Sequence, residues 1–254
     1  MVKLPYQAVI VDLDRTLLRT DKTVSDYTLD VLRAWQEAGA FLLAATARPE
    51  RAITEYQNLI GFHCAATLNG ARTVIPGGIC ENPIDTEDAL AVLEQLSGLG
   101  GAVISVEAEN GIYANVDIPF WQPTVADEIW NLPRKEKIYK IIASHPDLPP
   151  EQILIDLPET VYSTVADKKL RQYMSKTATK WRGIKQMLDS LNLEADQAIY
   201  FGDDNDDLEP IRRCGRGVAV RNALDSVKEI ADEIAESNDE DGVARTLDRL
   251  WPRD

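Results

Sequence analysis

Two aspartates, separated by a single residue, end an apolar run near the start of the chain. The stretch AVIVDLDRTLL, residues 8–18, places Asp12 and Asp14 directly after four apolar residues. Like charges repel and burial disfavours ionised carboxylates, so such a pair requires a compensating partner. A DxD at the end of a strand is also typical of a turn or helix cap. Other residues must therefore decide between chemistry and local structure.

Further polar groups stand at comparable positions along the chain. Thr46 follows the apolar run AFLLAA, and Asp203 and Asp207 follow AIYFG. Lys180 opens a helix predicted over 181–191. Ligands bind beyond the carboxyl ends of the strands in open parallel sheets, so these groups are expected at one rim with the first pair.

Several carboxylates at one rim cannot all stay ionised unless positive charge lies among them. One lysine cannot balance the whole set. A hard divalent cation does so, and Mg²⁺ favours few carboxylates together with water and substrate phosphate. The oxygen spacing D-x-D-x-D-G of a calcium loop is not met by GDDNDD. The residues therefore indicate a metal site.

The elements that position these groups alternate between strands and helices. QAVIVD, AFLLAAT and CAATLNG are predicted as buried strands, because each is short, apolar and bounded. Helices are predicted over SDYTLDVLRAWQEAG, with Ser25 as N-cap, and over PERAITEYQNLIG. Apolar strands separated by single helices predict an α/β fold with a parallel sheet covered on both faces.

The middle of the chain breaks this pattern. VIPGGICEN and VISVEAENGIYANVD predict hairpins, the second around Asn110-Gly111, and TEDALAVLEQL and PPEQILI predict helices. Antiparallel strands with helices predict a separate α+β module over residues 82–175, inserted into a core of residues 1–81 and 176–254. The parallel pattern resumes with the strands AIYFGD, GVAV and DEIAE and the helices DLEPIRRC and NALDSVKEIA.

Composition excludes several classes of function. The 254 residues carry a formal net charge of −15, which disfavours nucleic acid and anionic membranes as partners. No apolar run approaches the roughly 18 residues of a membrane span, and the N-terminus does not have the pattern of a signal peptide. The three cysteines have no CxxC spacing, so neither a disulfide framework nor a zinc site is expected. A cytoplasmic location is expected.

Together the motifs resemble the haloacid dehalogenase superfamily of phosphohydrolases, in its Cof-type group, subfamily IIB. The resemblance covers nearly the whole chain and is weakest over residues 82–175. It implies a Rossmann-like core with an inserted cap domain. The four family motifs are matched, in chain order, by Asp12-Leu13-Asp14-Arg15-Thr16, by Thr46, by Lys180, and by Gly202 and Asp203 with Asp207.

The resemblance implies an Mg²⁺-dependent phosphatase that acts on a small phosphorylated metabolite such as a sugar phosphate. Asp12 would be the nucleophile that forms an aspartyl-phosphate, and Asp14 would act first as acid and then as base. The implied metal ligands are Asp12, Asp14 through its main-chain carbonyl, Asp203 and Asp207. The implied contacts to phosphate or substrate are Thr46, Ala47, Arg48, Asn69, Lys180 and Asp206. For Asn69, which precedes Gly70, a simple turn is the alternative.

Several positions depart from the usual pattern of this group, and they bear on substrate fit and rate. Arg15, Ala47 and Trp181 stand where glycine is usual. Asp206 replaces an asparagine, and Arg221 replaces a small residue. None of these changes removes a catalytic group. Asp206 adds negative charge beside an anionic substrate.

Substrate choice in similar proteins depends on the cap. Candidate contacts here are Arg134, Lys135, Lys137, Lys140, His145, Trp121 and Trp130. The alternative is that these charges are ordinary strand-edge residues and that the tryptophans belong to the core. The sequence does not identify the metabolite. The chain is expected to be a monomer or a small homo-oligomer.

Three alternative functions remain open at this point. A phosphomutase would use the same aspartyl-phosphate and return the phosphoryl group to the bound substrate. A response-regulator receiver also combines an acidic cluster with Thr and Lys, but it needs about half this length and no insert. A non-catalytic family member would bind metabolites only.

Overall fold

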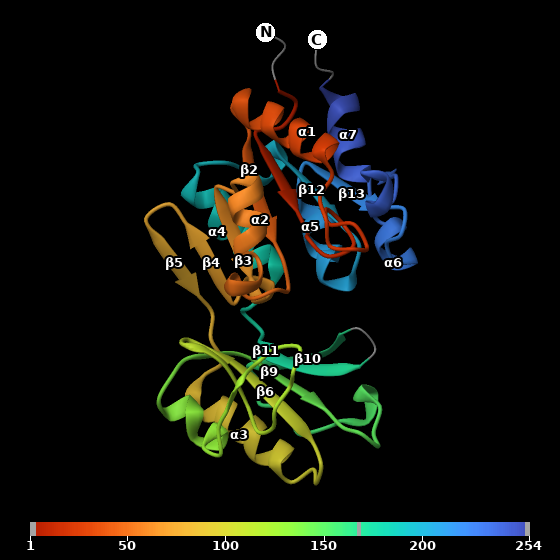
Figure 1. Ribbon diagram of the computed structural model, residues 1–254. Coiled ribbons are helices and arrows are strands. Elements are labelled where there is room, and N and C mark those ends of the chain that lie inside the picture. The colour runs from red at the N-terminus through yellow and green to blue at the C-terminus, as the bar shows by residue number, and fades with distance from the viewer. Residues whose placement is uncertain (1–3, 167–168, 252–254) are drawn as a thin grey trace. The chain divides into compact units, whose positions relative to one another are not determined.

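The computed structural model describes residues 4–166 and 169–251. The chain forms two compact units: one contains the residues up to Cys80 and those from Thr179 onward, and the other is Glu81–Ala178 (Figure 1). The first unit is therefore built from two segments that are distant in sequence. The sequence pattern predicts limits of 82 and 175 for the insert.

A single sheet forms the centre of the first unit, with its strands in the order β14-β13-β12-β1-β2-β3-β4-β5. The strands from β14 to β3 are parallel, and β4 is antiparallel to β3. The strands are β1 (Ala8–Val11), β2 (Phe41–Ala45), β3 (Cys64–Thr67), β4 (Arg72–Ile75), β5 (Gly78–Glu81), β12 (Ala198–Gly202), β13 (Arg216–Val220) and β14 (Glu233–Ala235). The predicted α/β fold with a mainly parallel sheet is confirmed.

Helices cover both faces of this sheet, which explains why its central strands are apolar throughout. On β1, Val9 and Val11 pack in a cluster with residues of α1 and α7, whereas Ala8 and Ile10 pack with residues of α4. Alternate side chains of a strand point to opposite faces, so a strand covered on both sides is apolar at every position. The helices of this unit are α1 (Asp26–Glu37), α2 (Thr54–Ile60), α4 (Lys180–Ser190), α5 (Leu208–Arg213), α6 (Asp225–Lys228) and α7 (Gly242–Leu250).

Short 3₁₀ turns join several of these elements. They are η1 (Glu50–Ala52), η2 (Leu68–Gly70), η5 (Ala195–Gln197), η6 (Asn205–Asp207) and η7 (Asn238–Glu240). The helix predicted over PERAITEYQNLIG is therefore divided into η1 and α2, and the one over NALDSVKEIA shortens to α6. The predicted N-cap of α1 is confirmed, because Ser25 accepts a hydrogen bond from the Thr28 main-chain N–H.

The second unit also contains one sheet, in the order β10-β11-β9-β6-β7-β8. Its strands are β6 (Val103–Ala108), β7 (Gly111–Ala114), β8 (Thr124–Val125), β9 (Ile138–Ser144), β10 (Val161–Ala166) and β11 (Leu170–Ser175). Its helical elements are α3 (Thr86–Ser97), η3 (Ile129–Arg134) and η4 (Pro150–Gln152). All strand pairs are antiparallel except β7 with β8, and β6 and β7 form the predicted hairpin.

The prediction of a helix over PPEQILI is wrong, because only the single turn η4 forms there. Ile153 leaves the helical region, with φ −77° and ψ 76°, and its side chain is buried in the core of the unit. Burial of the Ile153 side chain in the core of the unit therefore overrides the helical pattern of these residues.

The two faces of the second sheet differ in chemistry. Ile104 and Val106 of β6 pack with α3 in an apolar cluster. The opposite face of β6 and β9 carries Glu107 and Lys140, which are paired in the strand register and are buried. Among the described residues, no helix is long and apolar enough to cross a membrane.

Asp241 joins the start of α7 to the segment before α1. Its carboxylate accepts hydrogen bonds from the Arg19 guanidinium at 2.8 Å, from Ser25 Oγ at 2.8 Å and from Thr28 Oγ1 at 3.3 Å. Burial alone would raise the pKa of Asp241, but the hydrogen bonds from Arg19 and Ser25 hold that pKa below its ordinary value. The ionised form therefore stabilises the fold.

We expect Asp241→Asn to lower the free energy of unfolding by about 1–3 kcal/mol at neutral pH. A carboxylate with a depressed pKa contributes stability above its unfolded pKa, and that contribution is lost as the pH falls through the folded value. The difference in free energy of unfolding between wild type and Asp241→Asn should therefore become smaller below about pH 4. Urea unfolding at a series of pH values from neutral to below about pH 4 measures this difference. Asp189→Asn, at an exposed position, is the control. A difference that stays constant with pH would contradict the assignment.

Candidate active site

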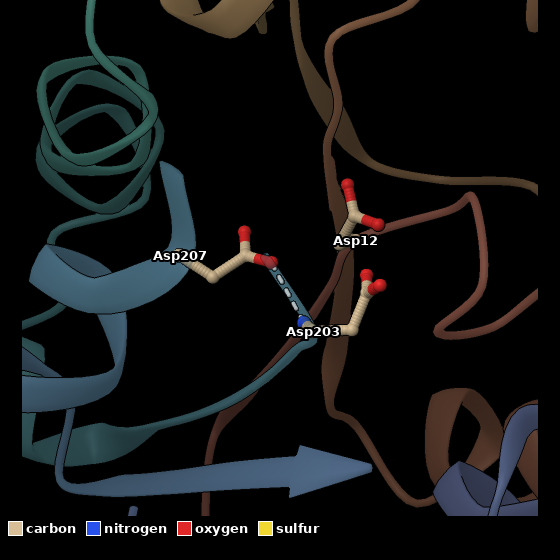
Figure 2. Close-up of side chains that lie close together, drawn as sticks. All are labelled: Asp12, Asp203 and Asp207. Carbon is tan, nitrogen blue, oxygen red and sulfur yellow. Dashed lines mark hydrogen bonds between the residues drawn. The ribbon is translucent and has the colours of Figure 1, made fainter. Parts of the chain in front are cut away.

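Three carboxylates converge where two neighbouring parallel strands end. Asp12 follows β1, Asp203 follows β12, and Asp207 closes η6 just beyond β12 (Figure 2). Each offers one oxygen, and these oxygens all lie within 4.8 Å of one another. All three residues are buried. The predicted gathering of acidic groups at the carboxyl end of the sheet is thus present in the structure.

Lys180 donates to two of these carboxylates. Its Nζ lies 2.7 Å from Asp12 Oδ1 and 2.6 Å from Asp207 Oδ1, and its side chain is only 4% exposed. The side chain is placed by the start of α4, where Thr179 Oγ1 accepts from the Arg182 main-chain N–H as N-cap. A buried ammonium is thereby fixed between the carboxylates.

The electrostatics of this cluster leave a negative excess. Burial, followed by repulsion from Asp207 and Asp203, raises the pKa of Asp12 well above its ordinary value despite the attraction of Lys180. Burial and repulsion by Asp207 raise the pKa of Asp203 to about 6. Although burial alone would lower it, attraction by Asp12 and Asp207 raises the pKa of Lys180. One ammonium therefore does not neutralise three carboxylates.

The donor set fits a metal ion. Three buried carboxylates with oxygens this close together form the environment that a hard cation prefers, and a divalent ion would offset the negative excess. The carboxylate trio of Asp12, Asp203 and Asp207 could therefore bind a metal. The side chain of Asp14, the remaining predicted acidic residue, is not part of this trio.

Asp207 has a fixed position because its neighbours donate to both of its oxygens. Oδ2 accepts from the main-chain N–H groups of Asp203 at 2.8 Å and Asp204 at 3.0 Å, and Oδ1 accepts from Tyr200 Oη at 2.5 Å. A Cβ on Gly202 would lie 2.5 Å from Asp207 Cγ, so only glycine fits there. The loop after β12 is therefore shaped around this one carboxylate.

Asp14 lies in a separate ion-pair cluster. Arg48 donates from Nε to Asp14 Oδ2 at 2.6 Å and from Nη2 to Oδ1 at 2.7 Å, and Lys22 Nζ donates to Oδ1 at 2.7 Å. Burial alone would raise the pKa of Asp14, but the hydrogen bonds from Arg48 and Lys22 lower it to about 2. Arg48, predicted as a substrate contact, is thus engaged with Asp14.

The remaining predicted contacts follow β2 and β3. Thr46 is buried, and its Oγ1 accepts from the Arg48 main-chain N–H at 3.2 Å, whereas Ala47 is exposed. The carbonyl of Thr46 accepts from the Asn69 main-chain N–H at 3.0 Å. Asn69 Nδ2 donates to Asp206 Oδ2 at 2.6 Å, and Asn69 Oδ1 is buried without a hydrogen-bond partner. Asp206, which stands where asparagine is usual, thus accepts a hydrogen bond from Asn69.

Arg15 adopts a conformation that explains why glycine is usual at its position. Its φ is 61°, in the left-handed region that non-glycine residues occupy at a cost of about 1 kcal/mol. Asn222 Nδ2 donates to the Arg15 carbonyl at 2.7 Å, and Arg15 Nε lies 3.8 Å from Asp203 Oδ2. The side chain adds an exposed positive charge near Asp203.

Trp181 and Arg221, the other two residues that depart from the family pattern, make contacts outside the carboxylate trio. The Arg213 guanidinium lies 5.2 Å from the centre of the Trp181 ring, and Arg221 pairs with Glu240 at 2.9 Å. Both contacts are with neighbouring side chains of the first unit.

Most basic candidates of the second unit pair with acidic neighbours. Lys137 Nζ lies 2.5 Å from Glu81 Oε2, Lys135 pairs with Glu128, and Arg134 lies 3.6 Å from Glu87. The ring Nε2 of His145 is 2.8 Å from the Gly100 carbonyl. The candidate tryptophans are only partly exposed: Trp130 packs on the apolar cluster that includes α3, and Trp121 is of intermediate burial. Lys140 differs from the other basic candidates because it is buried.

Thr16, the last residue of the first motif, donates from Oγ1 to Asp203 Oδ1 at 2.9 Å. Two further residues of the site are not evident from the sequence: Tyr200 and Lys22, each of which donates to one of the acidic side chains. Tyr200 gives one signal, because a tyrosine in a fully buried strand requires a hydrogen-bond partner. Lys22 gives none, since its contact with Asp14 depends on the fold of the loop between β1 and α1.

The comparisons with known proteins agree with this geometry. The family model of haloacid dehalogenase-like hydrolases matches residues 9–247, so the chain belongs to that family. The 5-amino-6-(5-phospho-D-ribitylamino)uracil phosphatase of Bacillus subtilis is 26% identical over 264 residues, covering 96% of each chain. The phosphoglycolate phosphatase of Methanopyrus kandleri is 26% identical over 246 residues, covering 95% of this chain and 96% of the relative.

A solved structure of a subclass IIB sugar phosphatase of the same superfamily has the same fold. It aligns with a TM-score of 0.81 at 20% identity, covering 96% of this chain and 98% of that one. The chain is a haloacid dehalogenase-like phosphatase, a hydrolase of phosphoric monoesters. The receiver alternative is excluded by a family match that spans both units.

Lys180→Met should destabilise the metal-free protein by about 3–5 kcal/mol, because it leaves buried carboxylates without their internal cation. Added Mg²⁺ should then stabilise the variant more than it stabilises the wild type. Urea unfolding with and without Mg²⁺ measures both effects. Lys185→Met, on the exposed side of the same helix, is the matched control. An equal Mg²⁺ effect on wild type and Lys180→Met would contradict the role given to Lys180.

Proposed function

We propose that this enzyme hydrolyses the phosphomonoester of a small metabolite, such as a sugar phosphate, through an aspartyl-phosphate on Asp12. The observation that carries the proposal is the position of Asp12 at the end of β1. There it accepts from Lys180 and lies against Asp203 and Asp207. A carboxylate nucleophile beside a cation and a metal-binding pair is suited to phosphoryl transfer, in which positioning and charge stabilisation supply most of the catalysis.

Mg²⁺ is the proposed cofactor. Asp12, Asp203 and the main-chain carbonyl of Asp14 would hold it, with Asp207 in support. When bound, the ion would reduce the repulsion between an anionic nucleophile and an anionic phosphate. Oxygen ligands of high negative charge and a single competing ammonium favour such a hard divalent cation.

The proposed reaction has two steps. In the first, an Asp12 carboxylate oxygen attacks phosphorus, the ester P–O bond breaks, and the departing oxygen receives a proton from Asp14. Because Arg48 and Lys22 hold Asp14 ionised in the free protein, Asp14 must first take up that proton from water or from the phosphate group of the substrate. In the second, Asp14 takes a proton from water as the water oxygen attacks the aspartyl-phosphate, which releases inorganic phosphate and restores Asp12. One residue thus serves as acid and then as base.

Lys180 and Thr46 are the proposed holders of the phosphoryl oxygens. An ammonium has three donors, and Asp12 and Asp207 account for two of them. We assign the third to a phosphoryl oxygen, where it would stabilise the charge that develops during transfer. The buried hydroxyl of Thr46 would donate to another.

The second unit is the proposed cap that selects the substrate. Relatives of this chain include a phosphatase named for a phosphoribityl compound and a subclass IIB sugar phosphatase. Both names support a polyhydroxylated substrate. Glu107, Lys140 and Gln172, buried polar residues of the second sheet, supply donors and acceptors suited to hydroxyl groups.

Asp12→Asn should abolish phosphate release from a panel of sugar phosphates and small phosphoesters, because a neutral amide cannot form the phosphoenzyme. EDTA should also stop release, and added Mg²⁺ should restore it. Asp189→Asn, an acid-to-amide change at an exposed position of α4, should keep wild-type activity. Activity of Asp12→Asn within about threefold of wild type would refute the assignment, since loss of a covalent nucleophile costs far more.

The same assay distinguishes the two alternative functions, a phosphomutase and a family member that only binds metabolites. Isomeric product without free phosphate would indicate a phosphomutase. Folded, metal-binding protein that releases no phosphate and forms no isomer from any substrate would favour a family member that only binds metabolites.

A further inference from the structure

The two oxygens of Asp203 have different surroundings. Oδ1 accepts a hydrogen bond from Thr16 Oγ1 at 2.9 Å. Among the described residues, none donates a hydrogen bond to Oδ2, and the only ion pair that reaches it is with Arg15, whose Nε lies 3.8 Å away. A carboxylate oxygen has two acceptor positions, so Oδ2 keeps both of them for a metal ion, whereas Oδ1 has already used one.

Asn222, in the loop after β13, holds both the backbone and the side chain of Arg15. Asn222 Nδ2 donates to the Arg15 carbonyl at 2.7 Å, and Arg15 Nη2 donates to the Asn222 carbonyl at 3.3 Å. Asn222 is fixed in turn, because its Oδ1 accepts from the Asn238 main-chain N–H at 3.0 Å. Asn238 is buried, and its Nδ2 donates to the Leu18 carbonyl at 3.0 Å. The Arg15 guanidinium therefore has a support that does not involve Asp203.

Neither backbone geometry nor stability favours an arginine at position 15. Its φ of 61° suits glycine, and a larger residue persists in such a conformation only where its surroundings enforce it. The ion pair with Asp203 is long, and the Arg15 side chain is 59% exposed, so the pair contributes little to stability. The remaining contribution of Arg15 is its positive charge beside a carboxylate of the metal-binding trio.

We propose that Arg15 lowers the Mg²⁺ affinity of the site by acting as a built-in cation beside Asp203 Oδ2. Like charges repel, so the guanidinium opposes a divalent ion at this oxygen, and its support by Asn222 keeps it close. Glycine, which is usual at this position, would allow tighter binding. The enzyme therefore responds to changes in Mg²⁺ concentration instead of holding the ion permanently. This inference rests on the proposed role of Asp203 as an Mg²⁺ ligand.

Metal binding to the substrate-free protein tests the proposal without a measurement of activity. Free Mn²⁺ is counted by electron paramagnetic resonance, and Mg²⁺ is then added to displace bound Mn²⁺, which gives the Kd of each ion. Arg15→Gln removes the charge and keeps a long side chain, whereas Arg15→Gly also removes the backbone strain. Arg15→Lys keeps the charge. Arg33→Gln, at an exposed position of α1, is the matched control for the loss of an arginine.

Arg15→Gln and Arg15→Gly should each lower the Kd of Mg²⁺ by roughly threefold to tenfold, because repulsion between a guanidinium and a nearby divalent ion is removed. Arg15→Lys and Arg33→Gln should both stay within about twofold of wild type, since neither changes the charge beside Asp203. Asp203→Asn should abolish binding at this site, which distinguishes the site from ions that bind to the acidic surface. Thermal unfolding verifies that each variant is folded.

Failure of the Arg15 role can be separated from failure of the metal site. If Arg15→Gln binds Mg²⁺ no more tightly than wild type while Asp203→Asn loses binding, the metal site stands and the role of Arg15 is overturned. An Arg15→Lys protein that binds as tightly as Arg15→Gln would also overturn it, because the charge would not be the cause. If Asp203→Asn leaves binding unchanged, the proposed Mg²⁺ site is wrong and the inference fails with it.

Discussion

Mutual repulsion among three buried carboxylates is the constraint on which the first unit depends. Asp12, Asp203 and Asp207 offer oxygens within 4.8 Å of one another, in a place from which water is largely removed. Such a group is unfavourable unless cations and hydrogen-bond donors surround it. Lys180 supplies one charge, and the Tyr200 hydroxyl and main-chain N–H groups satisfy Asp207. The remaining negative charge is what makes the site suited to a metal ion.

The fold provides two unlike environments for aspartates that are two residues apart. Asp12 lies among other acids in a buried cluster, and burial raises its pKa, whereas hydrogen bonds from Arg48 and Lys22 lower the pKa of Asp14 to about 2 despite burial. In the metal-free protein these environments run against the proposed roles, so a bound cation would have to restore the ionised form of Asp12, and Asp14 would have to gain a proton before it acts as acid. The difference between the two environments follows from backbone geometry, because the chain turns between the end of β1 and the loop before α1.

The sequence predicts the parallel sheet and the gathering of acids well, because both follow from local pattern. Runs such as AVIV of β1 are apolar at every position since helices cover both faces, and Asp12 and Asp203 come directly after such runs. The partners of these acids are not predictable in the same way. Lys22 donates to Asp14 because of the geometry of the loop that carries it, and Tyr200 donates to Asp207 because of the strand register. The PPEQILI segment was also mispredicted, because burial of Ile153 overrides its helical pattern.

The central claim is that Asp12 carries the phosphoryl group, and chemical trapping tests it most directly. The enzyme would be mixed with a substrate that it turns over and then reduced with borohydride, which converts an acyl-phosphate to homoserine. Peptide mass spectrometry would then locate the change. Our account predicts reduction at residue 12 alone, dependent on both substrate and Mg²⁺. Turnover with no reduction at Asp12, or with reduction at another carboxylate, would contradict it.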